Sequence, residues 1–215
     1  MKISIFKLKF ENKFVNLFQK NSKKIFLSDA LSEGLFVNRF ENRFKNFVKS
    51  KFAIAVSSGT SALETAFRAI NIRNKEVIIP TNTFFGTSIP ITRAGGTFVL
   101  CDQEKNGTGL DIEKFKKAIT KKTKAVCVVH IGGNISENFN KIKDICKKKK
   151  LYIIEDAAHA HGSKIKNNFA GTLGHIGCFS FFPTKVMTTG EGGMLTTNDK
   201  KLFEKIVKLK NFGRT

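Results

Sequence analysis

The chain has 215 residues, 41% of them hydrophobic, which is enough to bury the core of one large domain. No apolar run approaches the length that spans a bilayer. The N-terminal stretch MKISIFKLKFENKF is interrupted by charge and lacks a signal-peptide core. The sequence therefore predicts a folded protein with no membrane partner.

The formal net charge is +21, from 38 Lys plus Arg against 17 Asp plus Glu. One interpretation is a nucleic-acid binder. The alternative is compositional drift, because Lys, Asn, Ile and Phe are all abundant and the basic residues are spread along the chain. The densest basic run, residues 147–150, ends a predicted helix, where cations complement the helix dipole. We favour drift and expect no nucleic-acid partner.

The four cysteines are widely spaced and form no C-x-x-C motif. They are Cys101, Cys127, Cys146 and Cys178. Three of them lie in or beside apolar runs, which is typical of reduced, buried thiols rather than of a disulfide framework. We expect a cytoplasmic protein.

Residues 1–24 form an N-terminal segment rich in Lys, Phe and Asn, with no clear element. A short helix is predicted at residues 29–33, with Ser28 as its N-cap and Gly34 at its end. Apolar residues at positions 40, 44, 47 and 48 form a helical stripe.

From residue 53 onward, short apolar strands alternate with helices. Strands are predicted at residues 53–56, 77–79, 97–101, 125–129, 151–154, 178–181 and 194–197. Helices are predicted at 62–70, at 111–119 capped by Asp111, after Ser136, and at 199–209 capped by Asp199. Strands that are apolar throughout and alternate with helices favour an α/β fold, three-layer α/β/α, with a mostly parallel sheet of about seven strands.

Polar or glycine-rich clusters follow five of these strands. They read SSGTS, PTNTFFG, HIGG, EDAAHAHG and SFFPTK. The carboxyl ends of parallel strands share one edge of a sheet, where such folds bind ligands. The five clusters are therefore predicted to meet in one cleft.

The first two clusters allow more than one interpretation. In the segment 57–61, Gly59 lets the backbone approach a ligand, and the first helical turn, with Thr60 and Ser61, offers N–H groups to a phosphate. The alternative is an ordinary N-cap. Phe84 follows the second strand and is placed to stack on a flat heterocycle, although simple packing is the better interpretation in a chain with 22 Phe.

Asp156 ends the fifth predicted strand. Its carboxylate suits a metal ligand, a general base, the partner of a cationic ring nitrogen, or a helix N-cap. Glu155 alternates to the other face and is predicted to be structural. His159 and His161 form an H-x-H pair nearby, but no further ligand set accompanies them, so a metal site is not predicted.

Lys185 has the most specific context in the sequence. Pro183 and the hydroxyl of Ser180 precede it, and two threonines and GEGG follow it. An imine-forming lysine must be positioned and desolvated so that its amine is neutral. The alternative is one more surface lysine. An acid at a strand end and a constrained lysine together predict a site for pyridoxal 5'-phosphate.

The motifs SSGTSAL, P-x-x-T-F, EDAAHAHGS and SFFPTKVMTTGEGG occur in this order, and together they resemble the DegT–StrS family of pyridoxal-phosphate-dependent sugar aminotransferases. The segments ALSEGLFVNRFENRFKNF and LKNFGR add to the resemblance, which runs from about residue 25 onward. It implies the large domain of a fold-type I enzyme over residues 25–215, usually as a homodimer.

The resemblance also implies roles for individual residues. Lys185 would be the catalytic residue that links to the cofactor and moves the proton. Asp156 would hold the pyridine nitrogen protonated, and Phe84 would stack on the ring. His159, where many members have glutamine, would lie near the hydroxyl edge of the ring. Thr60 and Ser61 would bind the phosphate together with Ser180.

The implied reaction transfers an amino group from glutamate or glutamine to a keto group of a sugar, which is expected to be nucleotide-linked, for polysaccharide or secondary-metabolite biosynthesis. Family members continue past the position of Thr215 into a small C-terminal domain, which is absent from this chain. A second hypothesis is therefore a truncated, non-catalytic remnant that binds pyridoxal phosphate. A basic nucleic-acid binder ranks third, since no nucleic-acid motif is present.

Overall fold

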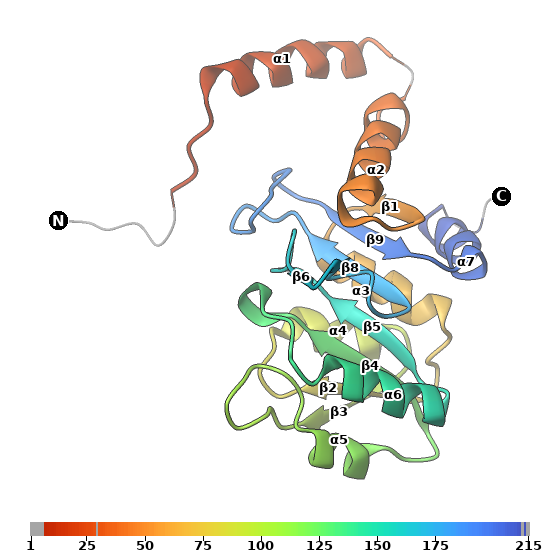
Figure 1. Cartoon of the computed structure of the whole chain (residues 1–215). Coiled ribbons are helices and arrows are strands. Elements are labelled where there is room, and N and C mark those ends of the chain that lie inside the picture. The colour runs from red at the N-terminus through yellow and green to blue at the C-terminus, as the bar shows by residue number, and fades with distance from the viewer. Residues whose placement is uncertain (1–6, 29, 212, 214–215) are drawn as a thin grey trace.

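The computed structural model describes residues 7–28, 30–211 and 213 (Figure 1). Its helices are α1 (Asn12–Phe26), α2 (Leu35–Val48), α3 (Gly59–Ala69), α4 (Phe85–Arg93), α5 (Ile112–Ala118), α6 (Phe139–Lys149) and α7 (Lys200–Lys210), with a 3-10 turn at Ile131–Gly133. Its strands are β1 (Phe52–Val56), β2 (Glu76–Pro80), β3 (Thr97–Cys101), β4 (Thr123–Val129), β5 (Tyr152–Asp156), β6 (Lys164–Ile165), β7 (Asn168–Phe169), β8 (Ile176–Ser180) and β9 (Gly193–Thr197).

Seven strands form one sheet in the order β1-β9-β8-β5-β4-β2-β3, and β6 and β7 form a separate small hairpin. Neighbours from β8 to β3 pair in parallel, whereas β9 pairs antiparallel with both β8 and β1. Because β9 is reversed between them, β1 and β8 run in the same direction. The carboxyl ends of β1, β8, β5, β4 and β2 therefore lie along one edge of the sheet.

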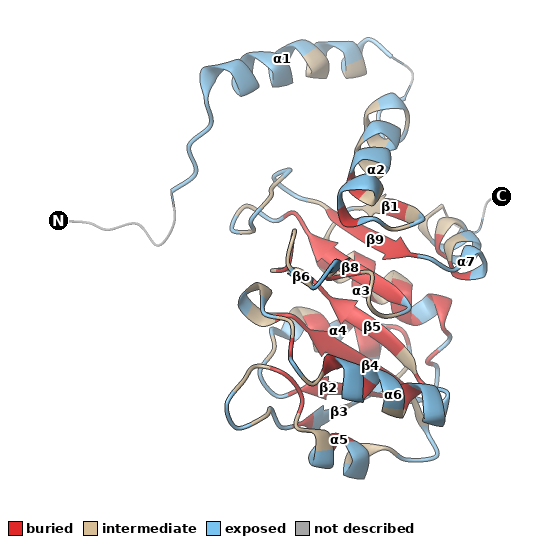
Figure 2. Ribbon diagram, in the orientation of Figure 1, coloured by how far each residue is buried: buried red, intermediate tan, exposed pale blue. Residues whose placement is uncertain are grey.

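Helices cover both faces of this sheet, which confirms the predicted three-layer α/β/α fold (Figures 1 and 2). Helices α3, α4 and α7 pack on one face, around a core that includes Phe67, Ile79 and Ile154. Helices α5 and α6 cover the other face, and α2 covers it near β1. Figure 2 shows the central strands as buried, which explains why their sequences are apolar without alternation.

Two predicted helix caps are confirmed. The Asp111 side chain accepts a hydrogen bond from the backbone N–H of Lys114 at 2.9 Å. The Asp199 carboxylate accepts from the N–H groups of Lys201 and Leu202, at 2.7 and 3.1 Å. Both acids satisfy donors that the first turn of a helix leaves free.

Two local predictions are wrong. Residues 30–34 are not helical, and α2 begins at Leu35; Asp29, where the predicted helix began, lies outside the described residues. Ser136 does not cap α6, whose N-cap is Asn138. The Ser136 hydroxyl instead accepts from the N–H of Asn138 and donates to Glu104, so it stabilises the loop before the helix.

Two helices were not predicted. Helix α1 lies in the stretch left unassigned, and none of its residues is buried. Helix α4 contains Pro90 and several β-branched residues, which disfavour a helix by propensity.

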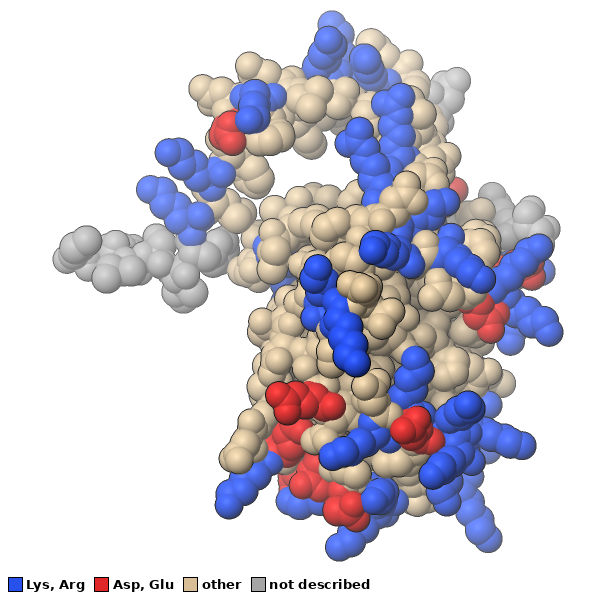
Figure 3. All heavy atoms as spheres, viewed as in Figure 1, with Lys and Arg blue, Asp and Glu red and all other residues tan. Residues whose placement is uncertain are grey.

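Among the described residues, no helix has the length and apolar character required to cross a bilayer. On the face shown in Figure 3, Lys and Arg side chains are spread from the top of the molecule to the bottom.

Candidate active site

A cavity of about 480 Å³ opens at the carboxyl edge of the sheet. Residues from all five predicted clusters line it, which confirms that they converge. They are Ser58, Gly59 and Thr60 after β1; Thr83, Phe84, Gly86 and Thr87 after β2; His130 and Ile131 after β4; Asp156, Ala158 and His159 at the end of β5; and Ser180, Phe182, Thr184 and Lys185 after β8. Leu63, Val129 and Glu191 complete the lining.

Asp156 and Lys185 line the same cavity, as a single ligand held between them would require. Of the eight predicted site residues, seven line this cavity: Gly59, Thr60, Phe84, Asp156, His159, Ser180 and Lys185. Ser61 is not part of the lining, because its side chain turns back toward Ser57 and Ser58.

Asp156 ends the central strand β5, and only 7% of its surface is exposed. The hydroxyl of Thr87 donates to one carboxylate oxygen at 2.7 Å, and the N–H of Ala158 donates to the other at 3.2 Å. The hydroxyl of Thr83 lies 2.7 Å from that of Thr87 and extends the chain of hydrogen bonds. These two bonds fix the orientation of the Asp156 carboxylate at the cavity, where it can meet a cationic group.

Lys185 lies on the loop after β8, and its Nζ is 2.7 Å from Nε2 of His159. Burial lowers the pKa of the Lys185 amine, although the negative charge of Asp156 acts in the opposite direction. Burial also lowers the pKa of His159, and the nearby Lys185 adds to this effect. A half-buried amine beside a histidine is suited to act as a nucleophile.

Glu155 has the structural role that its position on the opposite face predicted. It is fully buried, and one of its carboxylate oxygens lies 2.9 Å from Nε2 of His130. The backbone N–H groups of Gly171, Leu173 and Gly174 also donate to its carboxylate. Glu155 thus joins β5 to β4 and to the loop before β8, and it fixes the strand that carries Asp156.

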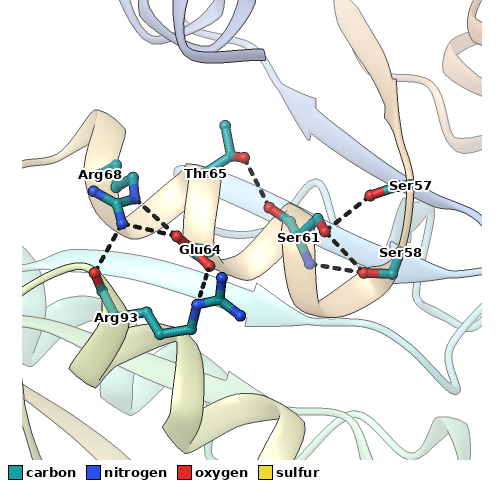
Figure 4. Close-up of polar contacts among 7 residues, drawn as sticks. All are labelled: Ser57, Ser58, Ser61, Glu64, Thr65, Arg68 and Arg93. Atoms are coloured by element: carbon teal, nitrogen blue, oxygen red, sulfur yellow. Dashed lines mark hydrogen bonds and ion pairs between the residues drawn. The ribbon is translucent and has the colours of Figure 1, made fainter. Parts of the chain in front are cut away.

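The N-terminus of α3 lines the cavity next to Ser180, the last residue of β8. The Ser58 side chain caps the helix by accepting from the N–H of Ser61 at 3.0 Å (Figure 4). Within the described residues, the N–H groups of Gly59 and Thr60 donate no hydrogen bond. A Cβ atom on Gly59 would lie 2.7 Å from that of Ser180, so only glycine allows this close approach. The turn therefore presents two free donors to an anion.

Further along α3, Glu64 forms ion pairs with Arg68 and with Arg93 of α4 (Figure 4). The Arg68 guanidinium also donates to the Arg93 carbonyl oxygen at 2.8 Å. These contacts hold α3 against α4, whose first turn carries Thr87.

Phe84 lies at the mouth of the cavity with 62% of its surface exposed. Its ring centroid is 3.9 Å from that of Phe85. An exposed ring beside the cavity is available to cover a flat ligand, whereas simple packing, the alternative interpretation, would bury it.

Sequence reasoning missed two residues that organise the site. Thr87 binds Asp156 from α4, a helix whose proline concealed it. His130 directly follows a predicted strand, and its position in the HIGG cluster was the available signal; its bond to Glu155 depends on the pairing of β4 with β5. The described residues contain no group of three metal-binding side chains.

The fold is that of pyridoxal-phosphate-dependent aminotransferases. The model of the DegT/DnrJ/EryC1/StrS aminotransferase family matches residues 13–215, and the chain belongs to this family.

Individual relatives agree with this assignment. The chain is 39% identical to GDP-perosamine synthase of Escherichia coli O157:H7 over 164 residues, which are 76% of this chain and 45% of that protein. It superposes with a TM-score of 0.87 on an aminotransferase from Psychrobacter cryohalolentis, at 34% identity, covering 93% of this chain and 51% of the other.

It is also similar to Spr1654 of Streptococcus pneumoniae in its PLP form, with a TM-score of 0.85 and 25% identity over 92% of this chain and 56% of that one. The chain thus spans about half the length of the relatives it matches.

Proposed function

We propose that this chain carries the cofactor side of an aminotransferase that moves an amino group from glutamate or glutamine to a keto group of a sugar. The observation that carries the proposal is the shared cavity of Asp156 and Lys185. Family membership supports the reaction class, and the similarity to GDP-perosamine synthase supports a nucleotide-linked sugar for polysaccharide or secondary-metabolite biosynthesis.

The residues present fit pyridoxal 5'-phosphate by the chemistry of their donors. A fixed carboxylate, a half-buried amine and a helix N-terminus with free N–H groups match a pyridinium, an aldehyde and a phosphate. When bound, this cofactor acts as an electron sink for the carbon that gains or loses the amino group.

Each residue has one task in this proposal. Asp156 holds a proton on the ring nitrogen, and Thr87 keeps its carboxylate aimed. Thr60, by its backbone N–H, binds phosphate together with the hydroxyl of Ser180. Phe84 covers one face of the ring. The resemblance implies a phosphate contact for Ser61, but its N–H is already bonded to Ser58, so Ser61 completes the capped turn instead.

Lys185 carries the chemistry. Its amine would hold the cofactor through the aldehyde group, and the same amine, once released by the amino donor, would accept and return the proton at the carbon that loses or gains the amino group. His159 lies within hydrogen-bond distance of this amine.

We also propose that the protein works as a homodimer. Four apolar side chains lie exposed where α4 meets the edge strand β3: Phe85, Ile89, Phe98 and Leu100, with exposed fractions from 39% to 61%. Phe98 and Leu100 pair with Val77 and Ile79 of β2, which face the core under α4, so the exposed side chains share one face. Such a patch is typical of an interface.

Sedimentation velocity tests this surface. Leu100→Lys is expected to shift a dimer to monomer. Leu209→Lys, which changes another exposed leucine on α7, is expected to leave the dimer intact. Equal behaviour of the two variants would argue against this interface.

Two further proposals concern the cellular compartment and the domain boundaries. All four cysteines are free and buried, which fits a reducing cytoplasm. We treat residues 25–215 as the cofactor-binding domain and residues 1–24 as a separate segment.

Reconstitution with pyridoxal phosphate tests the function. The chain is expected to form a yellow Schiff base that borohydride fixes on Lys185, identified by peptide mass spectrometry. Lys185→Ala is expected to remain colourless, whereas Lys205→Ala, a change on the exposed face of α7, is expected to behave as the parent chain. A colourless parent chain saturated with cofactor would refute the proposal.

A further inference from the structure

Both ring nitrogens of His159 have partners. Nδ1 lies 3.3 Å from the backbone nitrogen of Gly132, which donates its hydrogen to the ring, and Nε2 lies 2.7 Å from Nζ of Lys185. A backbone N–H is always a donor, so Nδ1 must carry a lone pair. The neutral ring then has its hydrogen on Nε2.

This tautomer decides the direction of the second bond. A hydrogen on Nε2 points at Nζ of Lys185, and an ammonium group has no lone pair to receive it. If the lysine were charged and donated to Nε2, the hydrogen of the neutral ring would move to Nδ1 and meet the N–H of Gly132. Two donors would then face each other at 3.3 Å. The arrangement is satisfied only when the lysine is the acceptor.

We propose that His159, fixed in its Nε2–H tautomer by Gly132, is a positioning residue that holds Lys185 as a neutral, nucleophilic amine. The inference rests on the proposed function, because a neutral amine is the form that attacks an aldehyde. A glutamine at this position would not select the neutral lysine, since its amide can either donate or accept a hydrogen bond.

The charged groups around the pair act in both directions. Asp156 favours a charged lysine, whereas burial disfavours it, and burial has the larger effect on the pKa of Lys185. His161 lies near both residues and is itself kept neutral by burial. Glu191 also lines the cavity but is exposed to solvent. Burial also disfavours the imidazolium form of His159, in agreement with a neutral ring.

Trace acetylation measures the lysine directly and without cofactor. The 215-residue chain is labelled with isotopic acetic anhydride from about pH 6 to 11, and the reactivity of each lysine is read by peptide mass spectrometry. Lys185 is expected to titrate below exposed lysines of the same chain, which serve as internal controls. In His159→Gln, the pKa of Lys185 is expected to rise. The reactivity of Lys185 at pH 7 is expected to fall about threefold to tenfold, which corresponds to the loss of one hydrogen bond.

Nitrogen NMR of the histidine-labelled parent chain tests the tautomer independently and needs no folded variant. The expected spectrum shows His159 protonated at Nε2 and bare at Nδ1. A hydrogen on Nδ1, or a Lys185 titration unchanged in a folded His159→Gln, would overturn the inference.

The two proposals fail separately. A chain that shows the expected tautomer and lysine titration but never binds pyridoxal phosphate would refute the function alone. A chain that forms the Schiff base with His159 protonated on Nδ1 would refute the role of His159 alone.

Discussion

His161 allows a quantitative test of how the site is built. Its ring packs against Phe44, Phe179 and Phe181, with centroids 5.2 to 6.5 Å away, and only 8% of its surface is exposed. Within the described residues, neither ring nitrogen has a hydrogen-bond partner. The backbone of Ser180 lies close enough to favour the charged form slightly, but burial outweighs it and lowers the pKa of His161 to about 4.

The perturbation is His161→Leu, an apolar change of similar volume. The pKa of an unfolded histidine is 6.5, so above that pH the ring is neutral in both states and its stability contribution is fully present. As the pH falls below 6.5, the unfolded chain binds a proton that the folded chain refuses, and stability is lost until about pH 4. A separation of about 2.5 pH units corresponds to a loss of about 3 kcal/mol.

Urea unfolding at a series of pH values checks this magnitude. At pH 7 the variant is expected to lie within about 1.5 kcal/mol of the parent chain. Between pH 7 and pH 4 the parent chain is expected to lose about 3 kcal/mol more than the variant. Carboxylates that titrate in this range are common to both proteins and cancel in the difference. Parallel stability curves would show that His161 is accessible to protons in the folded state and would refute the reasoning.

Three further predictions concern the supports of the site. Glu155→Gln turns one carboxylate oxygen into a donor that faces other donors, and it is expected to cost about 3 kcal/mol of unfolding free energy by urea titration; a loss below about 1 kcal/mol would contradict the bonding described. Thr87→Val removes the bond to Asp156 at nearly constant shape and is expected to weaken pyridoxal phosphate binding by about threefold to tenfold, as measured by absorbance titration. Unchanged binding would count against this role. Asp199→Ala removes the cap of α7 and is expected to cost about 1 kcal/mol, whereas unaltered urea midpoints would show that the cap contributes nothing.

The sequence predicted the sheet well because burial on both faces imposes a simple pattern. Runs such as residues 77–79 and 125–129 are apolar without alternation, and the structure has buried strands there. The shared edge followed from strand direction alone, so residues as distant as Gly59 and Lys185 were predicted to meet. Neither inference requires the order of the strands, which local patterns do not encode.

The contacts between elements could not be predicted. The bond from Thr87 to Asp156 joins residues 69 positions apart, and that from His130 to Glu155 depends on the register of β4 against β5. The tautomer of His159 likewise depends on where the turn at Gly132 brings its N–H. Hydrogen bonds of this kind are properties of packing rather than of local sequence.

The missed helices have local explanations. Helix α4 packs against α3 and buries Thr87, Pro90 and Ile91, and this packing compensates for poor intrinsic propensity. Helix α1 buries none of its apolar residues, so packing against a core, the criterion by which the other helices were predicted, does not apply to it. The wrong helix at residues 29–33 rested on a plausible cap at Ser28, whose hydroxyl instead donates to the carbonyl oxygen of Ile25 at the end of α1.

The reversed strand β9 has a consequence for how the chain is made. It lies between β1 and β8, so β1, although synthesised early, has no partner in the sheet until Gly193–Thr197 has been translated. During translation, the first strand and the turn that carries Gly59 must therefore wait for about 140 further residues to leave the ribosome. A nascent chain arrested before β9 would expose two bare strand edges, which are sites of aggregation, and would be a natural client for chaperones.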